Sequence, residues 1–281
     1  MLAVLAALPA ASADFSGTRA LEFTRQAVSF GPRPPGSPAL DKLRAHILEQ
    51  LRALRCEVDV DAFTAQTPRG AVAMRNLIAR FPGRSGRALV FSGHYDTKWF
   101  PRIRFVGAND GGASTGFLLE MAHALSGRPR KDDVWLVWFD GEEAFGEWSD
   151  TDGAYGSRHL AQRWAAERKL ARIKALINVD MIGDRDLGIL REAHSTPWLM
   201  QLIWDTAARL GLGRHFLPDG GPVEDDHVAF LRAGVSAANL IDFDDDYWHT
   251  EADTMDKLSA GSFQVVGAVL LEVTRKLEEM N

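Results

Sequence analysis

Two adjacent glutamates, Glu142 and Glu143, follow an apolar run at residues 134–139 that is typical of a buried strand. Two carboxylates side by side at the end of such a strand are costly, because burial and mutual repulsion both disfavour the doubly charged state. A metal ion would resolve this conflict if one glutamate coordinated it and the other stayed free as an acid or base. The alternative is a solvated acidic loop, and this short motif alone does not decide between the two.

Further metal-ligating side chains follow the other apolar runs of the chain. In chain order they are His94 and Asp96, Asp110, Asp180 and His249. Each has an ordinary structural role when taken singly, since a lone histidine is more often a hydrogen-bonded core residue and aspartates are common in turns. Their recurrence after four separate runs favours one shared site.

The ligand types indicate the metal. Imidazole and carboxylate groups without a thiolate suit a catalytic zinc ion that keeps a position open for water or substrate. Asp96 stands two residues after His94 and is too close to form a separate site. We expect it to orient a neighbouring ligand instead.

The elements that must position these groups alternate along the chain. Four apolar runs, at 88–91, 134–139, 175–179 and 237–241, are separated by segments with helical periodicity. This alternation predicts an α/β fold with a mostly parallel central sheet and helices on both faces. Ligands of such sheets bind outside the carboxyl ends of the strands, so the candidate side chains should converge at one rim.

The remaining elements complete the predicted fold. A hairpin is expected from the strands 58–67 and 71–81, with turn residues between them. The helices are expected at residues 18–29, 37–54, 112–125, 154–169, 196–210, 226–233 and 262–280.

Composition limits the class of protein. The chain has 281 residues, of which 46% are hydrophobic, and no Pro/Gly/Ser-rich linker interrupts it, which predicts one catalytic domain over residues 14–281. The net charge is −6 and no basic stripe is present, so nucleic acid is not an expected partner. We expect a monomer. The single cysteine, Cys56, excludes an intramolecular disulfide.

The first 13 residues resemble a truncated signal peptide. They are apolar and end in the small residues Ala11, Ser12 and Ala13, although the usual basic start is missing. The stretch is too short to span a bilayer. It predicts export to the periplasm or the medium.

Five motifs together resemble the zinc aminopeptidase clan. They are His94-Tyr95-Asp96, Gly107-Ala108-Asn109-Asp110, Asp140-Gly141-Glu142-Glu143, Asp180-Met181-Ile182-Gly183 and His249-Thr250. Three further stretches are similar to glutaminyl-peptide cyclotransferases: residues 143–160, 224–235 and 248–250. The resemblance runs from about His94 to Leu258.

This resemblance implies roles for individual residues. One zinc ion per chain would be held by Asp110, Glu143 and His249. The catalytic residues would be Glu142, as general acid and base, with Asp180 and Asp225. The substrate would contact Trp148, Trp248 and Glu224. In the peptidases of the clan, His94 and Asp180 complete a second metal site, so the ligand set alone does not give the metal count.

Two functions fit these roles. A cyclotransferase would convert the N-terminal glutamine of a peptide or protein to pyroglutamate and release ammonia. A zinc aminopeptidase would instead use Glu142 to activate water and hydrolyse N-terminal residues. Intact Glu142 argues against a binding module with a degenerate site, and a structural protein would not need clustered carboxylates. Two departures from the animal cyclases, Glu224 in place of an amide and the acidic run Asp244–Asp246, bear on substrate preference.

Overall fold

A computed structural model of the chain describes residues 15–244 and 246–280. The predicted leader at residues 1–13 lies outside this range, as does Asp245. Export therefore stays a prediction. The monomeric state also stays a prediction, because the structure contains a single chain. Within the described ranges, none of the helices is both long enough and apolar enough to cross a membrane.

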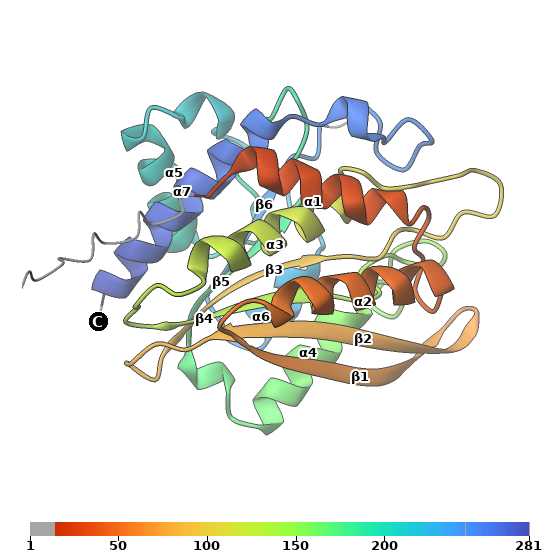
Figure 1. Cartoon of the computed structure of the whole chain (residues 1–281), viewed down its shortest axis with the longest axis horizontal. Coiled ribbons are helices and arrows are strands. Elements are labelled where there is room, and N and C mark those ends of the chain that lie inside the picture. Colours follow the sequence, from red (N-terminus) through yellow and green to blue (C-terminus); the bar gives the residue numbers. More distant parts are fainter. Residues whose placement is uncertain (1–14, 245, 281) are drawn as a thin grey trace, which may run out of the picture.

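A six-stranded sheet lies at the centre of the molecule, between layers of helices (Figure 1). The strands are β1 (Glu57–Thr67), β2 (Gly70–Phe81), β3 (Ala88–His94), β4 (Asp133–Phe139), β5 (Ile173–Asp180) and β6 (Ala237–Ile241). The helices are α1 (Gly17–Ser29), α2 (Pro38–Arg52), α3 (Gly112–Leu125), α4 (Tyr155–Ala166), α5 (Pro197–Arg209), α6 (Asp226–Arg232) and α7 (Ala260–Glu279). Three short 3-10 helices cover Leu170–Arg172, Gly213–His215 and Met255–Lys257.

The strand order is β1-β2-β4-β3-β5-β6. β3 pairs in parallel with both β4 and β5, and β5 pairs in parallel with β6. The β1–β2 hairpin is antiparallel and joins the sheet through an antiparallel β2–β4 pair. The predicted mostly parallel sheet is confirmed, because the four strands formed by the apolar runs, β3 to β6, all point in one direction.

Side chains alternate between the two faces of the sheet, as the period of a strand requires. In β4, Val134, Leu136 and Trp138 pack in the larger core, which α1, α2, α3, α5 and α7 cover. Trp135 and Val137 face the opposite core, which is built with α4 and α6. Helices therefore cover both faces, and the apolar runs are continuous because neither face meets water.

The observed elements differ from the prediction at a few ends. His94 and Asp180 are the last residues of β3 and β5, not residues beyond them, because the ladder continues through the pairs His94–Phe139 and Asp180–Ile241. The helix expected over 154–169 ends at Ala166. The chain leaves it through Arg168, whose φ of 57° is left-handed and cannot continue a helix.

Candidate active site

The carboxyl ends of β3, β4 and β5 and the segment after β6 meet at one rim of the sheet, where two groups of metal-ligating side chains overlap. One group is His94, Asp110 and Asp180, and the other is Asp110, Glu143 and His249. Within each group, one ligand atom per residue lies within 4.8 Å of the others. Asp110 belongs to both groups. Asp96 belongs to neither, but one of its oxygens lies 3.6 Å from His94 Nδ1.

The first group is buried and follows directly from the strand order. His94 ends β3 and Asp180 ends the adjacent parallel strand β5, and Asp110 precedes the helix α3. The His94 Nε2 atom lies 3.2 Å from an oxygen of Asp110 and 3.2 Å from an oxygen of Asp180. Its side chain is 1% exposed, so these three groups interact away from bulk water.

The second group lies nearer the surface. His249 Nε2 is 3.1 Å from Glu143 Oε1 and 3.4 Å from Asp110 Oδ2. The imidazole is held by the edges of Phe100 and Phe105. His249 has a left-handed backbone, with φ of 56°, which is uncommon for a residue other than glycine and is often found at functional sites.

The charges of this cluster fit a cation. Burial and the neighbouring Asp110 raise the pKa of Glu143 to about 7. Burial would lower the pKa of His249, but hydrogen bonds to Asp110 and Glu143 raise it to about 9. Asp110 Oδ2 is buried, and among the described residues His249 Nε2 approaches it at 3.4 Å. The two groups together contain more carboxylates than histidines, so a cation would balance their charge. Imidazole nitrogen and carboxylate oxygen are also the ligand atoms that zinc accepts.

Glu142 lines the same cavity but belongs to neither ligand group. Burial raises its pKa well above the ordinary value, and the carboxylates of Glu143 and Asp225 raise it further. A carboxyl group with a raised pKa in a cleft is a candidate for both accepting and releasing a proton during a reaction. Glu142 therefore has the position and the environment of an acid–base group.

The turn that carries the two glutamates is fixed by Asp96. The carboxylate of Asp96 accepts the backbone N–H of Glu142 at 3.1 Å and that of Glu143 at 3.3 Å. Gly141 has a φ of 72°, and a Cβ there would lie 2.6 Å from the sulfur of Met74. Asp96 thus holds the backbone of Glu143, a candidate metal ligand, in the position where the sequence suggested that it orients a neighbour.

Asp225 precedes α6 and is held by two asparagines from the sheet. Asn178 Nδ2 donates to Asp225 Oδ1 at 3.1 Å, and Asn239 Nδ2 donates to Asp225 Oδ2 at 2.6 Å. The two asparagines are opposite each other in the β5–β6 ladder. Their role was not predicted from the sequence, although a polar residue inside each of two buried apolar runs was a usable signal.

A cavity of about 570 Å³ opens above these groups. Its walls include the predicted substrate residues Trp148, Trp248 and Glu224. Trp148 is 38% exposed and Trp248 is 41% exposed, so both lie at the mouth of the cavity. Sequence reasoning missed several other lining residues, namely Lys98, Phe100, Leu190, Val223, Ile241 and Phe243.

A buried glutamate, also missed, anchors the loop before Asp225. Glu192 accepts the backbone N–H groups of His194 at 2.7 Å and Val223 at 3.0 Å, and its other oxygen lies 3.1 Å from His227 Nε2. Burial would raise the pKa of Glu192, but these hydrogen bonds and one from Ser195 lower it to about 2. The loop that ends in Glu224 is therefore tied to the interior by a charged group.

The acidic run after β6 lies on the surface. Asp244 and Asp246 are exposed, and neither lines the cavity. The neighbouring Phe243 does line it and packs against Trp248, with ring centroids 5.0 Å apart. The cavity is therefore shaped by the aromatic side chains of this loop. The described carboxylates, Asp244 and Asp246, do not contribute to its walls.

Comparison with known proteins identifies the family. The sequence profile of peptidase family M28 matches residues 76–274. A glutaminyl-peptide cyclotransferase of Drosophila melanogaster is 33% identical, over 79% of this chain and 70% of the fly protein.

Solved structures agree with this family, and they show that the fold also occurs in a protein of another name. The glutaminyl cyclase of an Acidobacteriales bacterium superposes with a TM-score of 0.93 at 40% identity, over 99% of this chain and 100% of that one. A leucine aminopeptidase precursor from Bacteroides thetaiotaomicron superposes with a TM-score of 0.86 at 23% identity, over 94% and 98%, and shares the fold. The chain belongs to the glutaminyl-peptide cyclotransferases within peptidase family M28.

Proposed function

We propose that this enzyme converts the N-terminal glutamine of peptides or proteins to pyroglutamate, with one zinc ion held by Asp110, Glu143 and His249. The observation that carries the proposal is Glu142, a buried carboxyl with a raised pKa that stands free beside this ligand group in an aromatic-rimmed cavity. The cyclase activity named for the relatives supports it.

The reaction needs one bond made and one broken. The α-amino nitrogen of the glutamine attacks its own γ-carbonyl carbon, and the bond from that carbon to the amide nitrogen breaks to release ammonia. Zinc bound by Asp110, Glu143 and His249 would act as a Lewis acid on the γ-carbonyl oxygen. Glu142 accepts a proton from the α-ammonium group before the attack and returns it to the departing nitrogen, and the new ring nitrogen releases its second proton to solvent.

Two aspartates assist Glu142 in this proposal. Asp180 and Asp225 line the cavity with it and accept hydrogen bonds from the substrate nitrogens. The two asparagines hold the Asp225 carboxylate in one orientation, since each donates a hydrogen bond to one of its oxygens. Because the attacking amine and the carbonyl belong to one residue, holding the glutamine in a folded conformation contributes much of the rate.

The mouth of the cavity selects the substrate. Trp148 and Trp248 form apolar walls for the methylene groups of the glutamine side chain, while Glu224 adds negative charge that favours a cationic N-terminus. Trp248 also stacks on the ring of His249, with centroids 4.0 Å apart. Substrate contact and metal ligation thus fall on adjacent residues.

A second candidate function is aminopeptidase activity. It is favoured by the complete second group of ligands, His94, Asp110 and Asp180, which could hold another metal ion. Glu142 would then activate water against the peptide bond.

One assay distinguishes the two functions. Purified enzyme is incubated with glutaminyl peptides and, separately, with leucyl and alanyl anilides, and its metal content is measured. We expect ammonia and pyroglutamate from the first, little free aniline from the second, and one zinc per chain. Efficient anilide hydrolysis with two metals per chain and no pyroglutamate would favour the aminopeptidase.

A further inference from the structure

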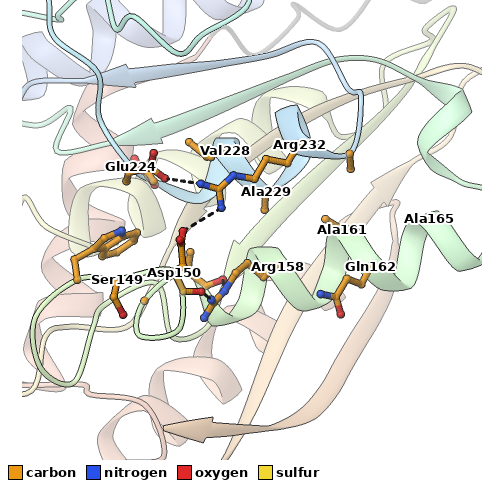
Figure 2. A pocket seen from close by; sticks show the side chains of 15 residues that line it. Ser149, Asp150, Arg158, Ala161, Gln162, Ala165, Glu224, Val228, Ala229 and Arg232 are labelled. Carbon is orange, nitrogen blue, oxygen red and sulfur yellow. Dashed lines mark hydrogen bonds and ion pairs between the residues drawn. The ribbon is translucent and has the colours of Figure 1, made fainter. Parts of the chain in front are cut away.

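A second hollow of about 350 Å³ adjoins the cavity, between the helices α4 and α6 (Figure 2). It is hereafter called the α4–α6 groove. Trp148, Glu224 and Asp225 line both the groove and the cavity, so the two spaces share a wall. None of the catalytic roles proposed above uses the rest of the groove.

The shared wall is held in place. Gly153 lies directly under Trp148, where an added Cβ would be 2.7 Å from a carbon of the indole ring. The φ of Gly153 is 115°, a backbone conformation that favours glycine. The indole can therefore rest flat on the backbone and present surface to the cavity and to the groove.

The groove leads away from the active site. Asp225 at the start of α6 and Ala154 at the start of α4 lie at its near end, and Ala165 and Ala233 line it at the far ends of the same helices. Ala165 is eleven positions after Ala154, the N-cap of α4, which corresponds to about 16 Å along the helix. That length holds roughly five residues of extended peptide.

The lining suits a peptide. Methyl groups of the alanines and of Val228 form an apolar floor, as Figure 2 shows for Ala161, Ala165 and Ala229. Above it, Arg232 lies 3.5 Å from an oxygen of Asp150 and 3.4 Å from an oxygen of Glu224.

These two ion pairs are long and solvent-exposed, so they contribute little and exchange readily for other partners. Donors and acceptors are therefore available together along the rim. A peptide backbone needs both, because each residue presents an N–H and a C=O group.

We propose that the α4–α6 groove binds the residues that follow the N-terminal glutamine, with an apolar side chain of the peptide on its floor. This inference rests on the proposed function, which places the glutamine in the adjoining cavity. The enzyme would accordingly prefer peptides of about five or six residues with apolar side chains after the glutamine over dipeptides.

The test compares a glutaminyl hexapeptide that carries leucines after the glutamine with a glutaminyl dipeptide amide. We expect kcat/KM of the wild-type enzyme to be at least about tenfold higher for the hexapeptide, the factor that corresponds to half burial of one leucine side chain. Ala165→Phe fills the far end of the groove and should lower this ratio at least about fivefold. Ala166→Phe is the matched control, because Ala166 is exposed on the same helix and does not line the groove.

Ala233→Phe fills the groove from α6 and should act like Ala165→Phe, which guards against a folding defect in either variant. Equal ratios for wild type and both filled variants, or an equal fall in Ala166→Phe, would overturn the proposal.

Binding separates this inference from the proposed function. The same two peptides are titrated calorimetrically into zinc-loaded Glu142→Gln protein and its double variant with Ala165→Phe. Tighter hexapeptide binding that Ala165→Phe removes supports the groove even if no pyroglutamate forms. Binding that ignores peptide length overturns the groove even if cyclisation occurs.

Discussion

The floor of the cavity and its mouth are built in different ways. On the floor, His94 and Asp110 are 1% and 3% exposed, and strand ends and buried hydrogen bonds fix their positions. At the mouth, Trp148 and Trp248 are 38% and 41% exposed and stand on loops. The floor groups are charged and mutually dependent, whereas the mouth supplies shape.

This difference separates chemistry from substrate choice. The floor depends on the sheet, because the sheet dictates where side chains at the strand ends meet. Loops at the mouth can change without disturbing the sheet. Changes to the floor should therefore cost far more activity than changes to the mouth, and the following experiments measure that contrast.

Metal removal should have the largest effect. A chelator should abolish pyroglutamate formation, and added zinc should restore it, because the proposed reaction needs a cation that these candidate ligand groups would hold. Circular dichroism should change little, since the ligands lie at the edge of a large sheet with its own core. Full activity in protein shown by elemental analysis to hold no transition metal would contradict the proposed mechanism.

The two adjacent glutamates provide the sharpest pair of floor variants. Glu142→Gln should keep its zinc and lose roughly 10²–10⁴-fold in kcat, the usual contribution of an acid–base group. Glu143→Gln should instead lose zinc affinity, because Glu143 lies among the candidate ligands. The check is to measure kcat and bound zinc for both variants. If Glu142→Gln lost zinc and Glu143→Gln kept it, the roles of the two glutamates would be the reverse of those assigned.

Glu192 ties the loop at the mouth of the cavity to the interior. Replacing it should lower the stability of the fold more than it lowers the rate of the reaction. Its pKa is lowered to about 2, so its stabilising contribution is present above the ordinary glutamate pKa and is lost as pH falls through about 2. Glu192→Gln should reduce the free energy of unfolding at pH 7 by about 1–3 kcal/mol.

Urea unfolding of both proteins from pH 7 to pH 2 checks this prediction. The gap between wild type and Glu192→Gln should narrow as the pH falls from about 4.5 toward 2. A gap that stays constant over this range would mean that the charge of Glu192 does not contribute.

The smallest effect is expected at the mouth. Trp248→Ala should weaken cyclisation by about 10- to 100-fold, from the roughly 1.5–3 kcal/mol of burying one apolar side chain, and should leave bound zinc near the wild-type value. Trp198→Ala is a suitable control, since Trp198 is 41% exposed and does not line the cavity. Loss of zinc in Trp248→Ala would show that its stacking on His249 supports the metal site.

The residues at the floor of the cavity were predicted from the sequence better than the hydrogen bonds that hold them in place. Apolar runs identify parallel strands, and the rule that ligands gather at their carboxyl ends was enough to bring His94, Asp110 and Asp180 together. The hydrogen bonds from Asn178 and Asn239 to Asp225 were not predictable in the same way. They exist because β5 and β6 are neighbours in register, and apolar runs do not specify strand order.

The mouth was predicted only where a family motif covered it. Trp148 and Trp248 belong to recognisable motifs, whereas Phe100 and Phe243 come from loops whose course depends on packing. Glu192 was invisible for a related reason: its partners lie on the loops around it and on α6, up to 35 residues away in the chain.

The left-handed backbone at His249 and at Met181, next to Asp180, has an evolutionary consequence. Each such residue costs the fold about 1 kcal/mol or more relative to a glycine at the same place. Selection for stability alone would then favour glycine or asparagine at these positions, against the metal site. A lineage released from the need for catalysis should lose His249 early, and an engineered search for thermostable variants should exclude this position from its library.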